Sequence, residues 1–200
     1  MICVSGACGQ CPAFAGSPRF VDNGNGTITD RQTCLVWEKK DDAGGIHDKD
    51  NYYQWSSTGT NPDGGAFTVF LAGLNSAGFA GHHDWRLPTS AGCCGYPTGQ
   101  AAELESIVDS GVSGCGSGSP CVDPPLNTNC GTNSSGNAGC TVDGAGSTQE
   151  CSCTVPSSDW SGSTVSASPG YAWGVYFYGG YVGYGSKAGG NYARGVRGGL

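Results

Sequence analysis

The sequence contains few charged residues. Only 12% of its 200 residues are Asp, Glu, Lys or Arg, and nine basic side chains face sixteen acidic ones. Such a low charge content excludes a chain that stays unfolded through self-repulsion. The formal net charge of −7 argues against the basic surface that a nucleic-acid-binding domain needs. We therefore expect no nucleic acid among the partners of this protein.

Long apolar runs are also missing. No segment approaches the roughly 18 consecutive apolar residues that a membrane-spanning helix requires, so we expect no membrane insertion. The N-terminus lacks the basic-then-apolar pattern of a secretory signal. The cysteine content described next nevertheless indicates export, and we expect the signal peptide to lie outside this numbering.

Glycine and cysteine are abundant instead. The 37 glycines predict many turns and few long helices. Twelve cysteines in a short polar chain indicate a disulfide framework formed in an oxidising compartment, and hence an extracellular or cell-surface protein. The predicted disulfide cysteines are Cys3, Cys8, Cys11, Cys34, Cys93, Cys94, Cys115, Cys121, Cys130, Cys140, Cys151 and Cys153.

The Cys8-Gly-Gln-Cys11 segment has the spacing of half a zinc site or of a thiol–disulfide motif. No second pair with this spacing occurs, and Cys151-Ser-Cys153 is the nearest analogue. Structural disulfides are therefore the favoured interpretation, with a metal site as the alternative. We expect no metal at these cysteines.

The chain divides into two parts by composition. Residues 1–18 form a cysteine-containing lead-in, and residues 19–200 form the domain itself. A cysteine-rich stretch at about 111–155 has no hydrophobic periodicity and contains six cysteines. An irregular loop of this length is unusual inside a compact domain unless covalent links hold it. We therefore expect a long loop held by disulfides.

Local patterns predict a mixture of strands and helices. An Asn-Gly-Asn-Gly turn at 23–26 between short apolar segments predicts a hairpin, and 35–37 is typical of a buried strand. Apolar residues at helical spacing predict a first helix over 66–75 that stops at Gly78. A second helix is predicted over 100–109, with Leu104, Ile107 and Val108 inward. The fold class is therefore α+β.

The last stretch, YAWGVYFYGGYVGYGSKAGGNYARGVRGG, alternates between two kinds of residue. It predicts two strands joined by a turn at Gly179–Gly180, with Trp173, Val175 and Phe177 facing the core and Gly174, Tyr176 and Tyr178 on the other face. Tyrosine suits recognition surfaces because it offers a large amphipathic area at a small cost in rotamer entropy. The alternative is that these tyrosines pack against the long loop or a neighbouring subunit.

Several segments together resemble a known family. In chain order they are FVDNGNGTITDRQTCLVWEKK, HDKDNYYQWS, TNPDGGAFTVFLAGLN, GFAGHHDWRLPT, AAELESIVD and the C-terminal stretch. This combination resembles the bacterial extracellular domain family that includes the C-terminal domain of the Legionella collagen-like adhesin. The resemblance implies a C-type-lectin-like fold, in which two helices pack on a mixed, mostly antiparallel sheet and the N- and C-terminal strands pair.

The resemblance also implies a function. Family members are secreted or surface ligand-binding modules, some of which bind sulfated glycans. Others are the variable proteins of diversity-generating retroelements, whose diversified positions are rich in Tyr, Gly, Ser and Asn. The positions with that character here are Gly174, Tyr176, Tyr178, Gly183, Tyr184, Gly185, Ser186 and Asn191.

Calcium is the one cofactor that the resemblance leaves open. Residues 22–30 superficially match a calcium-binding loop, but Gly24 and Gly26 occupy positions where ligands would be needed, so a hairpin turn is favoured. The Glu-Pro-Asn type tripeptide of calcium-dependent lectins is absent. Calcium-dependent sugar binding is therefore not expected.

The histidine clusters have structural interpretations. In GHHDWRLPT, Asp84 and Arg86 are expected to form a buried hydrogen-bonded set around Trp85. The segment from His47 to Asp50 is expected to be an exposed polar turn. A metal site or catalytic base at either cluster would need a third group that the sequence does not locate.

These observations lead to one favoured function and two alternatives. The favoured one is a glycan- or surface-protein-binding module, with ligand-binding residues Tyr176, Tyr178, Tyr181, Tyr184, Ser186, Asn191 and Tyr192. The first alternative is a structural subunit of an extracellular filament or homo-oligomer such as a trimer. The second is an enzyme, by analogy with formylglycine-generating enzymes. Catalysis is not expected, because every cysteine can be paired and no motif supplies a nucleophile with its base.

Overall fold

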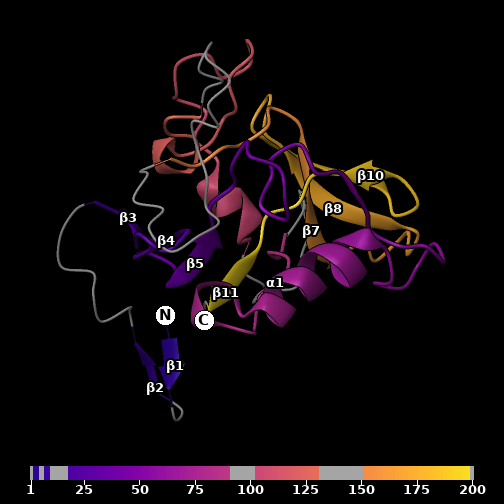
Figure 1. The fold of residues 1–200 in the computed structure, drawn as a ribbon. Coiled ribbons are helices and arrows are strands. Elements are labelled where there is room, and N and C mark those ends of the chain that lie inside the picture. Colours follow the sequence, from indigo (N-terminus) through magenta and orange to yellow (C-terminus); the bar gives the residue numbers. More distant parts are fainter. Residues whose placement is uncertain (1, 5–6, 10–17, 91–101, 131–150, 199–200) are drawn as a thin grey trace.

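The computed structural model describes residues 2–4, 7–9, 18–90, 102–130 and 151–198. Figure 1 shows the order of the elements along the chain. The strands are β1 (Ile2–Val4), β2 (Ala7–Gly9), β3 (Phe20–Asp22), β4 (Thr27–Asp30), β5 (Leu35–Glu38), β6 (Tyr53–Gln54), β7 (Ser158–Thr164), β8 (Tyr171–Tyr176), β9 (Tyr181–Ser186), β10 (Gly190–Asn191) and β11 (Val196–Gly198). The helical segments are η1 (Ala66–Leu71), α1 (Ala72–Ala77), η2 (Phe79–Gly81), η3 (Leu104–Ile107) and η4 (Pro124–Leu126).

The first sheet joins the two ends of the domain. Its strand order is β11-β5-β4-β3 and every neighbouring pair is antiparallel. The predicted hairpin at 23–26 is confirmed: Gly24 and Gly26 have φ of 68° and 84°, which suits glycine, and the Gly24 N–H donates to Asp22 Oδ1 over 2.9 Å. The C-terminal strand β11 pairs with β5, so it closes the sheet formed by the early part of the chain.

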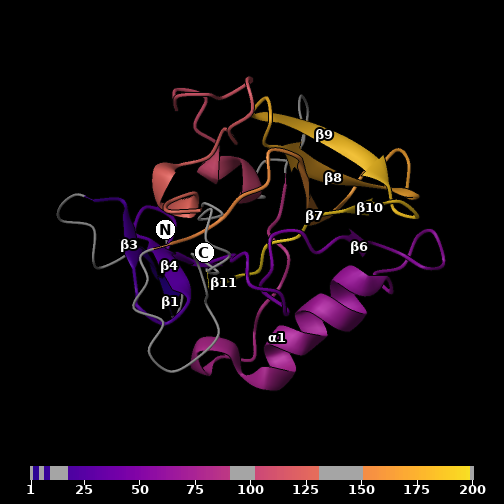
Figure 2. The ribbon, with the colours of Figure 1, turned by 45° about the horizontal axis from the view of Figure 1, so that its top comes forward.

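The second sheet has the order β7-β8-β9 and is also antiparallel. The predicted C-terminal hairpin, with its turn at 179–180, is confirmed as β8 and β9. A short β10–β6 pair lies beside β7, because the Tyr192 N–H donates to Ser158 O and the Trp160 N–H donates to Tyr192 O. Figure 2 shows this group of strands on the side of the molecule away from β3–β5, with α1 alongside.

The helices differ partly from the prediction. The first forms as η1 continued by α1, and it stops at Gly78, whose φ of 61° is left-handed. The prediction of a helix over 100–109 is wrong for its described part, 102–109, where the 3₁₀ turn η3 forms instead. The reason is tertiary pairing, since the Asp109 N–H donates to Cys121 O and the Asp123 N–H donates to Ile107 O, and these bonds compete with helix continuation. The described residues thus form an α+β structure with one α-helix.

Two clusters of buried apolar residues form the core. The first lies between the two sheets and includes Ile28 and Trp37 from one and Val175 from the other, together with Leu104 and Leu126. The second packs the η1–α1 helix against the second sheet, and its members are Trp55, Ala66, Phe70, Leu71, Leu74, Trp85, Leu87, Trp160, Ala172 and Ala193. The sheet that carries the C-terminal hairpin therefore contributes to both clusters.

Disulfides link the described parts of the cysteine-rich region, 111–130 and 151–155. Cys115 bonds Cys121, and Cys130 bonds Cys153. Cys34 and Cys151 are disulfide-bonded as well. The predictions for Cys11, Cys93, Cys94 and Cys140 lie outside the described residues, and only the backbone is described for Cys3 and Cys8. Within the described part of the chain, no helix is both long and apolar enough to cross a membrane.

Two predictions about polar segments are wrong. Asp84 is exposed rather than buried; it forms an ion pair with Arg197 over 2.7 Å, while Arg86 pairs with Glu103. His47 is buried rather than exposed, because its Nδ1 lies 2.8 Å from the buried carboxylate of Glu38.

Candidate functional site

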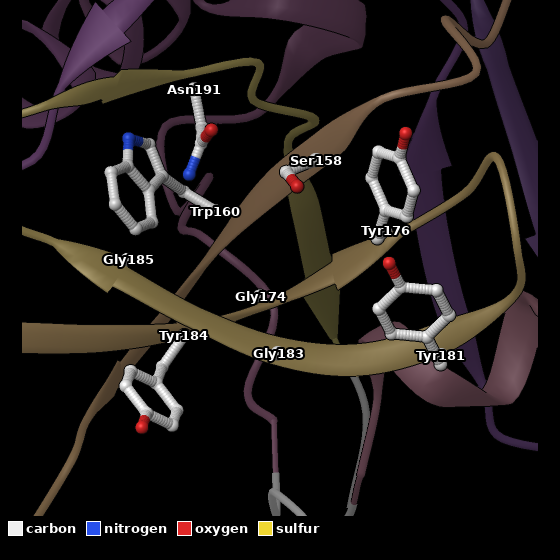
Figure 3. Close-up of a pocket in the computed structure, with 9 residues that line it drawn as sticks. All are labelled: Ser158, Trp160, Gly174, Tyr176, Tyr181, Gly183, Tyr184, Gly185 and Asn191. Atoms are coloured by element: carbon white, nitrogen blue, oxygen red, sulfur yellow. The ribbon is translucent and has the colours of Figure 1, made fainter.

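A groove of about 340 Å³ lies on one face of the β7–β8–β9 sheet. It combines strand residues with Asn191 at the end of β10, and Figure 3 shows the residues around it. The lining residues are Ser158, Trp160, Gly174, Tyr176, Tyr181, Gly183, Tyr184, Gly185 and Asn191. The volume is near the lower end of the range for small-molecule sites, about 300–1,000 Å³.

Three glycines form the floor of the groove. A Cβ at Gly174 would lie 2.4 Å from the carbonyl oxygen of Asp159, so only glycine allows β7 to approach β8 this closely. A Cβ at Gly185 would lie 3.0 Å from the indole of Trp160. At Gly183 a Cβ would meet no atom within 4 Å. The floor above Gly183 is therefore open.

The walls are aromatic with polar edges. At one end the rings of Tyr176 and Tyr181, which are opposite each other in the β8–β9 register, have centroids 5.2 Å apart. At the other end the buried indole of Trp160 is fixed by its Nε1–H, which donates to Tyr53 O over 2.8 Å. Within the described residues, neither the Ser158 hydroxyl nor the side-chain amide of Asn191 forms a hydrogen bond to protein. These groups can bind a ligand.

The predicted tyrosines do not share one face. Strand alternation places the side chains of Tyr171, Trp173 and Tyr184 on the face opposite Tyr181, where the Tyr184 ring packs edge-on against the other two. In Figure 3 the Tyr184 ring points away from the ring of Tyr181. The prediction that Trp173 is a core residue is wrong, since it is only half-buried, whereas Val175 and Phe177 are buried as predicted.

Three other predicted ligand-binding residues lie outside the groove. The Tyr178 ring is next to that of Tyr176, with centroids 5.8 Å apart, at the turn after β8. Ser186 pairs with Tyr171 at the far end of β9. Tyr192 packs edge-on against Tyr52. From the predicted set, Tyr176, Tyr181, Tyr184 and Asn191 line the groove, although the Tyr184 ring points away from that of Tyr181.

Sequence reasoning missed two groove residues on β7. Ser158 and Trp160 follow the irregular cysteine-rich stretch, and their partners Tyr176 and Gly174 are more than a dozen residues later. The only local signal was the single Trp160 within the otherwise polar segment SSDWSGST. That pattern is too short to identify a strand without knowing its neighbour.

A cluster of buried charges lies behind β7. Glu38 Oε1 is 3.1 Å from Lys40 Nζ and 2.8 Å from His47 Nδ1, and Glu38 Oε2 accepts the Gly195 N–H over 2.7 Å. Burial alone would raise the pKa of Glu38, but these partners lower it below its usual value. The Arg194 guanidinium donates to the Glu38 carbonyl oxygen over 2.8 Å.

Asp159 belongs to the same cluster, but its pKa is shifted in the opposite direction to that of Glu38. Its carboxylate accepts no hydrogen bond within the described residues, although the residue is buried. Burial raises the pKa of Asp159 to about 6, even though Arg194 and Lys40 oppose the shift. Asp159 lies between Ser158 and Trp160, so the cluster is directly linked to the strand that lines the groove.

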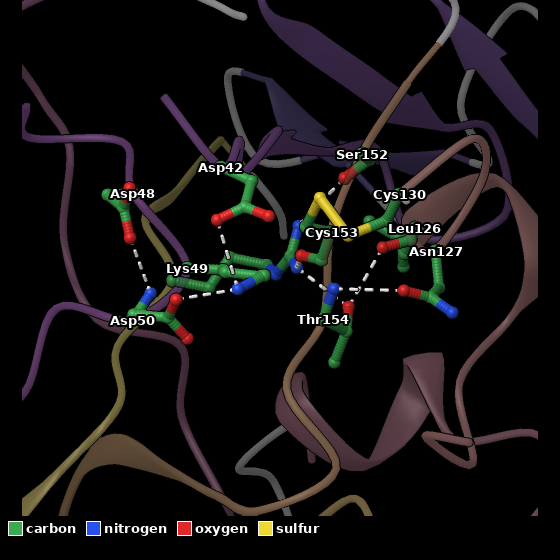
Figure 4. The surroundings of a disulfide bond; sticks show 11 residues. Asp42, Asp48, Lys49, Asp50, Leu126, Asn127, Cys130, Ser152, Cys153 and Thr154 are labelled. Atoms are coloured by element: carbon green, nitrogen blue, oxygen red, sulfur yellow. Dashed lines mark hydrogen bonds and ion pairs between the residues drawn. A yellow bond between two sulfur atoms is a disulfide. The ribbon is translucent and has the colours of Figure 1, made fainter. Parts of the chain in front are cut away.

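A second groove, of about 300 Å³, lies beside the Cys130–Cys153 disulfide. Figure 4 shows that Thr154 anchors this region, since its N–H donates to Asn127 Oδ1 and its hydroxyl donates to Leu126 O. At its rim, Lys49 forms ion pairs with two aspartates.

The rim of the second groove also contains the described residues' one grouping suited to a metal, Asp42, Asp48 and Asp50. Lys49 Nζ lies 3.1 Å from Asp42 Oδ1 and 2.6 Å from Asp50 Oδ2, so two of the three carboxylates already share a positive charge. The third, Asp48, accepts the backbone N–H groups of Gly44 and Asp50, so contacts within the protein account for all three.

Comparison with known proteins identifies a family but no individual relative. Residues 26–197 match the family model described as the Lcl C-terminal domain. No curated protein and no solved structure matches significantly.

Proposed function

This chain belongs to the family of Lcl C-terminal domains, and from that premise we propose that it is a secreted or cell-surface module that recognises a glycan or a surface protein. Family membership and the disulfides are consistent with a bacterial, extracellular, adhesin-like domain of a non-enzymatic type. In the proposal, the helix and sheets form a C-type-lectin-like scaffold.

The main support for this proposal is the groove on the second sheet. It has an open glycine floor, an aromatic wall and unpaired polar groups, which is the combination expected of a small binding site. Six of the eight positions with the composition of diversified sites line it: Gly174, Tyr176, Gly183, Tyr184, Gly185 and Asn191. We therefore extend the proposal to sequence diversification of this groove.

Replacing both Tyr176 and Tyr181 by alanine is expected to reduce capture of the labelled full chain on bacterial and host cell surfaces by at least about tenfold, since aromatic side chains dominate such contacts. Tyr171→Ala is the matched control, because Tyr171 is an exposed tyrosine of the same sheet on the opposite face. Unchanged capture by the double variant would show that the ligand binds elsewhere.

A second candidate function is self-assembly into a trimer or filament. The observation that favours it is an aromatic patch in which the exposed Tyr171 and Tyr184 contact each other beside the half-buried Trp173, with Tyr184 64% exposed. Exposed apolar patches often mark protein contacts. Light scattering after size-exclusion chromatography tests this candidate: an oligomer that Tyr184→Ala dissociates would support assembly through this patch.

A further inference from the structure

The groove presents rings and uncharged polar groups only. Tyr176 and Tyr181 supply flat faces with hydroxyl groups, while Ser158 and Asn191 supply a hydroxyl and an amide. In Figure 3 the Tyr181 ring and the Asn191 amide mark opposite ends of the groove. No charged side chain is among the lining residues.

The cations nearest in the sequence are used inside the protein. Lys187 is 1% exposed: its Nζ donates to Thr60 O and Thr164 Oγ1 over 2.8 Å each, and it lies 3.8 Å from the centroid of the Trp55 ring. Arg194 is equally buried and donates to Glu38 O and Thr154 Oγ1. Neither is available to an anionic ligand in the groove.

The carboxylates are also directed elsewhere. Asp159 follows Ser158 on β7, but strand alternation turns it away from the groove toward Lys40 and Arg194. In the acidic trio at 42–50, Asp42 and Asp50 pair with Lys49, and Asp48 accepts two backbone N–H groups. A calcium ion in the groove would therefore find no carboxylate ligand among the lining residues.

We infer that this groove binds an uncharged sugar ring of a neutral glycan, without calcium. The inference rests on the proposed recognition function and narrows it. The apolar C–H face of a pyranose can stack on a tyrosine ring, and its hydroxyls can pair with Ser158 and Asn191. A sulfate or carboxylate would lose its water here without gaining a cation, which is costly. Neutral sugars are therefore favoured over sulfated or acidic ones.

The test is a glycan microarray probed with the labelled full chain. The array carries neutral oligosaccharides ending in glucose, galactose, mannose or fucose, together with heparin, chondroitin sulfate and dextran sulfate fragments. We expect capture by neutral probes that persists from about 0.15 M to about 1 M NaCl, because no ion pair is involved. Capture is also expected to persist in EDTA.

Two variants locate the binding. Tyr181→Ala removes one wall, and Gly183→Val fills the open floor in a strand that tolerates a β-branched residue. Each is expected to weaken affinity for the best neutral oligosaccharide by about tenfold or more, whereas Tyr171→Ala should change it less than about twofold. Circular dichroism and thermal melting of each variant establish that the fold is retained.

Several outcomes would overturn the inference. Capture restricted to sulfated glycans and lost at high salt would contradict the neutral class, yet leave recognition standing. Capture of a surface protein but of no glycan would also contradict the inference of a neutral glycan ligand, while leaving the proposed recognition function standing. Loss of neutral-glycan capture in EDTA would contradict calcium independence. Loss of binding in Tyr171→Ala but not in Tyr181→Ala would move the site to the other face. Failure to capture any glycan or cell surface would overturn the proposed function as well.

Discussion

Replacing Glu38 by alanine is expected to lower the free energy of unfolding by about 3–5 kcal/mol, because it breaks the buried ion pairs and hydrogen bonds that this carboxylate forms. The carboxylate contacts Lys40, His47 and the Gly195 N–H at 2.7–3.1 Å, and it is fully buried. Lys40 is itself buried, and its ammonium lies 4.1 Å from the centroid of the buried Phe70 ring. The loss is large beside a typical total stability of about 5–15 kcal/mol.

Urea denaturation at pH 7 with the disulfides intact measures this loss. The matched control is Asp50→Ala, which removes an acidic residue whose side chain is 61% exposed and pairs with Lys49. Its expected cost is below about 1 kcal/mol, as for most exposed ion pairs. If Glu38→Ala were as stable as the control, the cluster would not hold the core together.

The parts of the fold that could be predicted are those specified by neighbouring residues. The hairpins at 23–26 and 179–180 follow from glycine-containing turns between apolar segments, and the first helix follows from its apolar spacing. The prediction of a helix over 100–109 was wrong because the same spacing of apolar residues also suits a buried 3₁₀ turn. Its apolar residues do reach the core, but backbone bonds to 121–123, distant in sequence, end it at Ile107.

The groove was predictable only in part for the same reason. Alternation in 171–186 correctly separates two faces of the hairpin, yet it does not show where the core beneath one face ends. Val175 reaches the core, whereas Trp173, two residues earlier on the same face, extends past it beside Tyr184. Ser158 and Trp160 complete the site through long-range pairing with β8, which no local pattern reveals.

Burial of charge could not be predicted from the sequence. The segment WEKKDD is typical of a solvated strand end, but Glu38, Lys39 and Lys40 are all buried. Their partners come from distant positions: His47 for Glu38, and Asp22 for Lys39, over 2.5 Å. A run of charged residues predicts an exposed segment. Such residues can be buried only where the fold brings a residue of opposite charge beside them, and the sequence alone does not show which distant residues the fold brings together.

The stability of this protein is expected to respond to pH through two opposing carboxylates. Because the pKa of Glu38 is lowered, its contribution to stability is present above the unfolded pKa and is lost as pH falls. Because burial raises the pKa of Asp159 to about 6, its contribution is full below the unfolded value near 3.8 and is lost as pH rises through 6. Ionised Asp159 thus destabilises the fold at neutral pH.

Asp159→Asn is therefore expected to be more stable than the wild type at pH 8, by up to about 3 kcal/mol for a shift of about two pKa units. The amide mimics the neutral acid, which the folded state prefers because the buried carboxylate accepts no hydrogen bond within the described residues. The advantage should shrink as pH falls through 6 and vanish near pH 4. Urea denaturation at several pH values measures this difference.

Asp84→Asn is a control for which the change in stability at pH 8 is expected to have the opposite sign. The Arg197 side chain lowers the pKa of the exposed Asp84, so its contribution is present at neutral pH and lost as pH falls. This variant should be less stable than the wild type at pH 8 and match it in acid. If Asp159→Asn instead followed the pattern of Asp84→Asn, ionised Asp159 would be a net stabilising partner of Arg194 and Lys40. The strand that lines the groove would then be held in place by charge pairing rather than by packing.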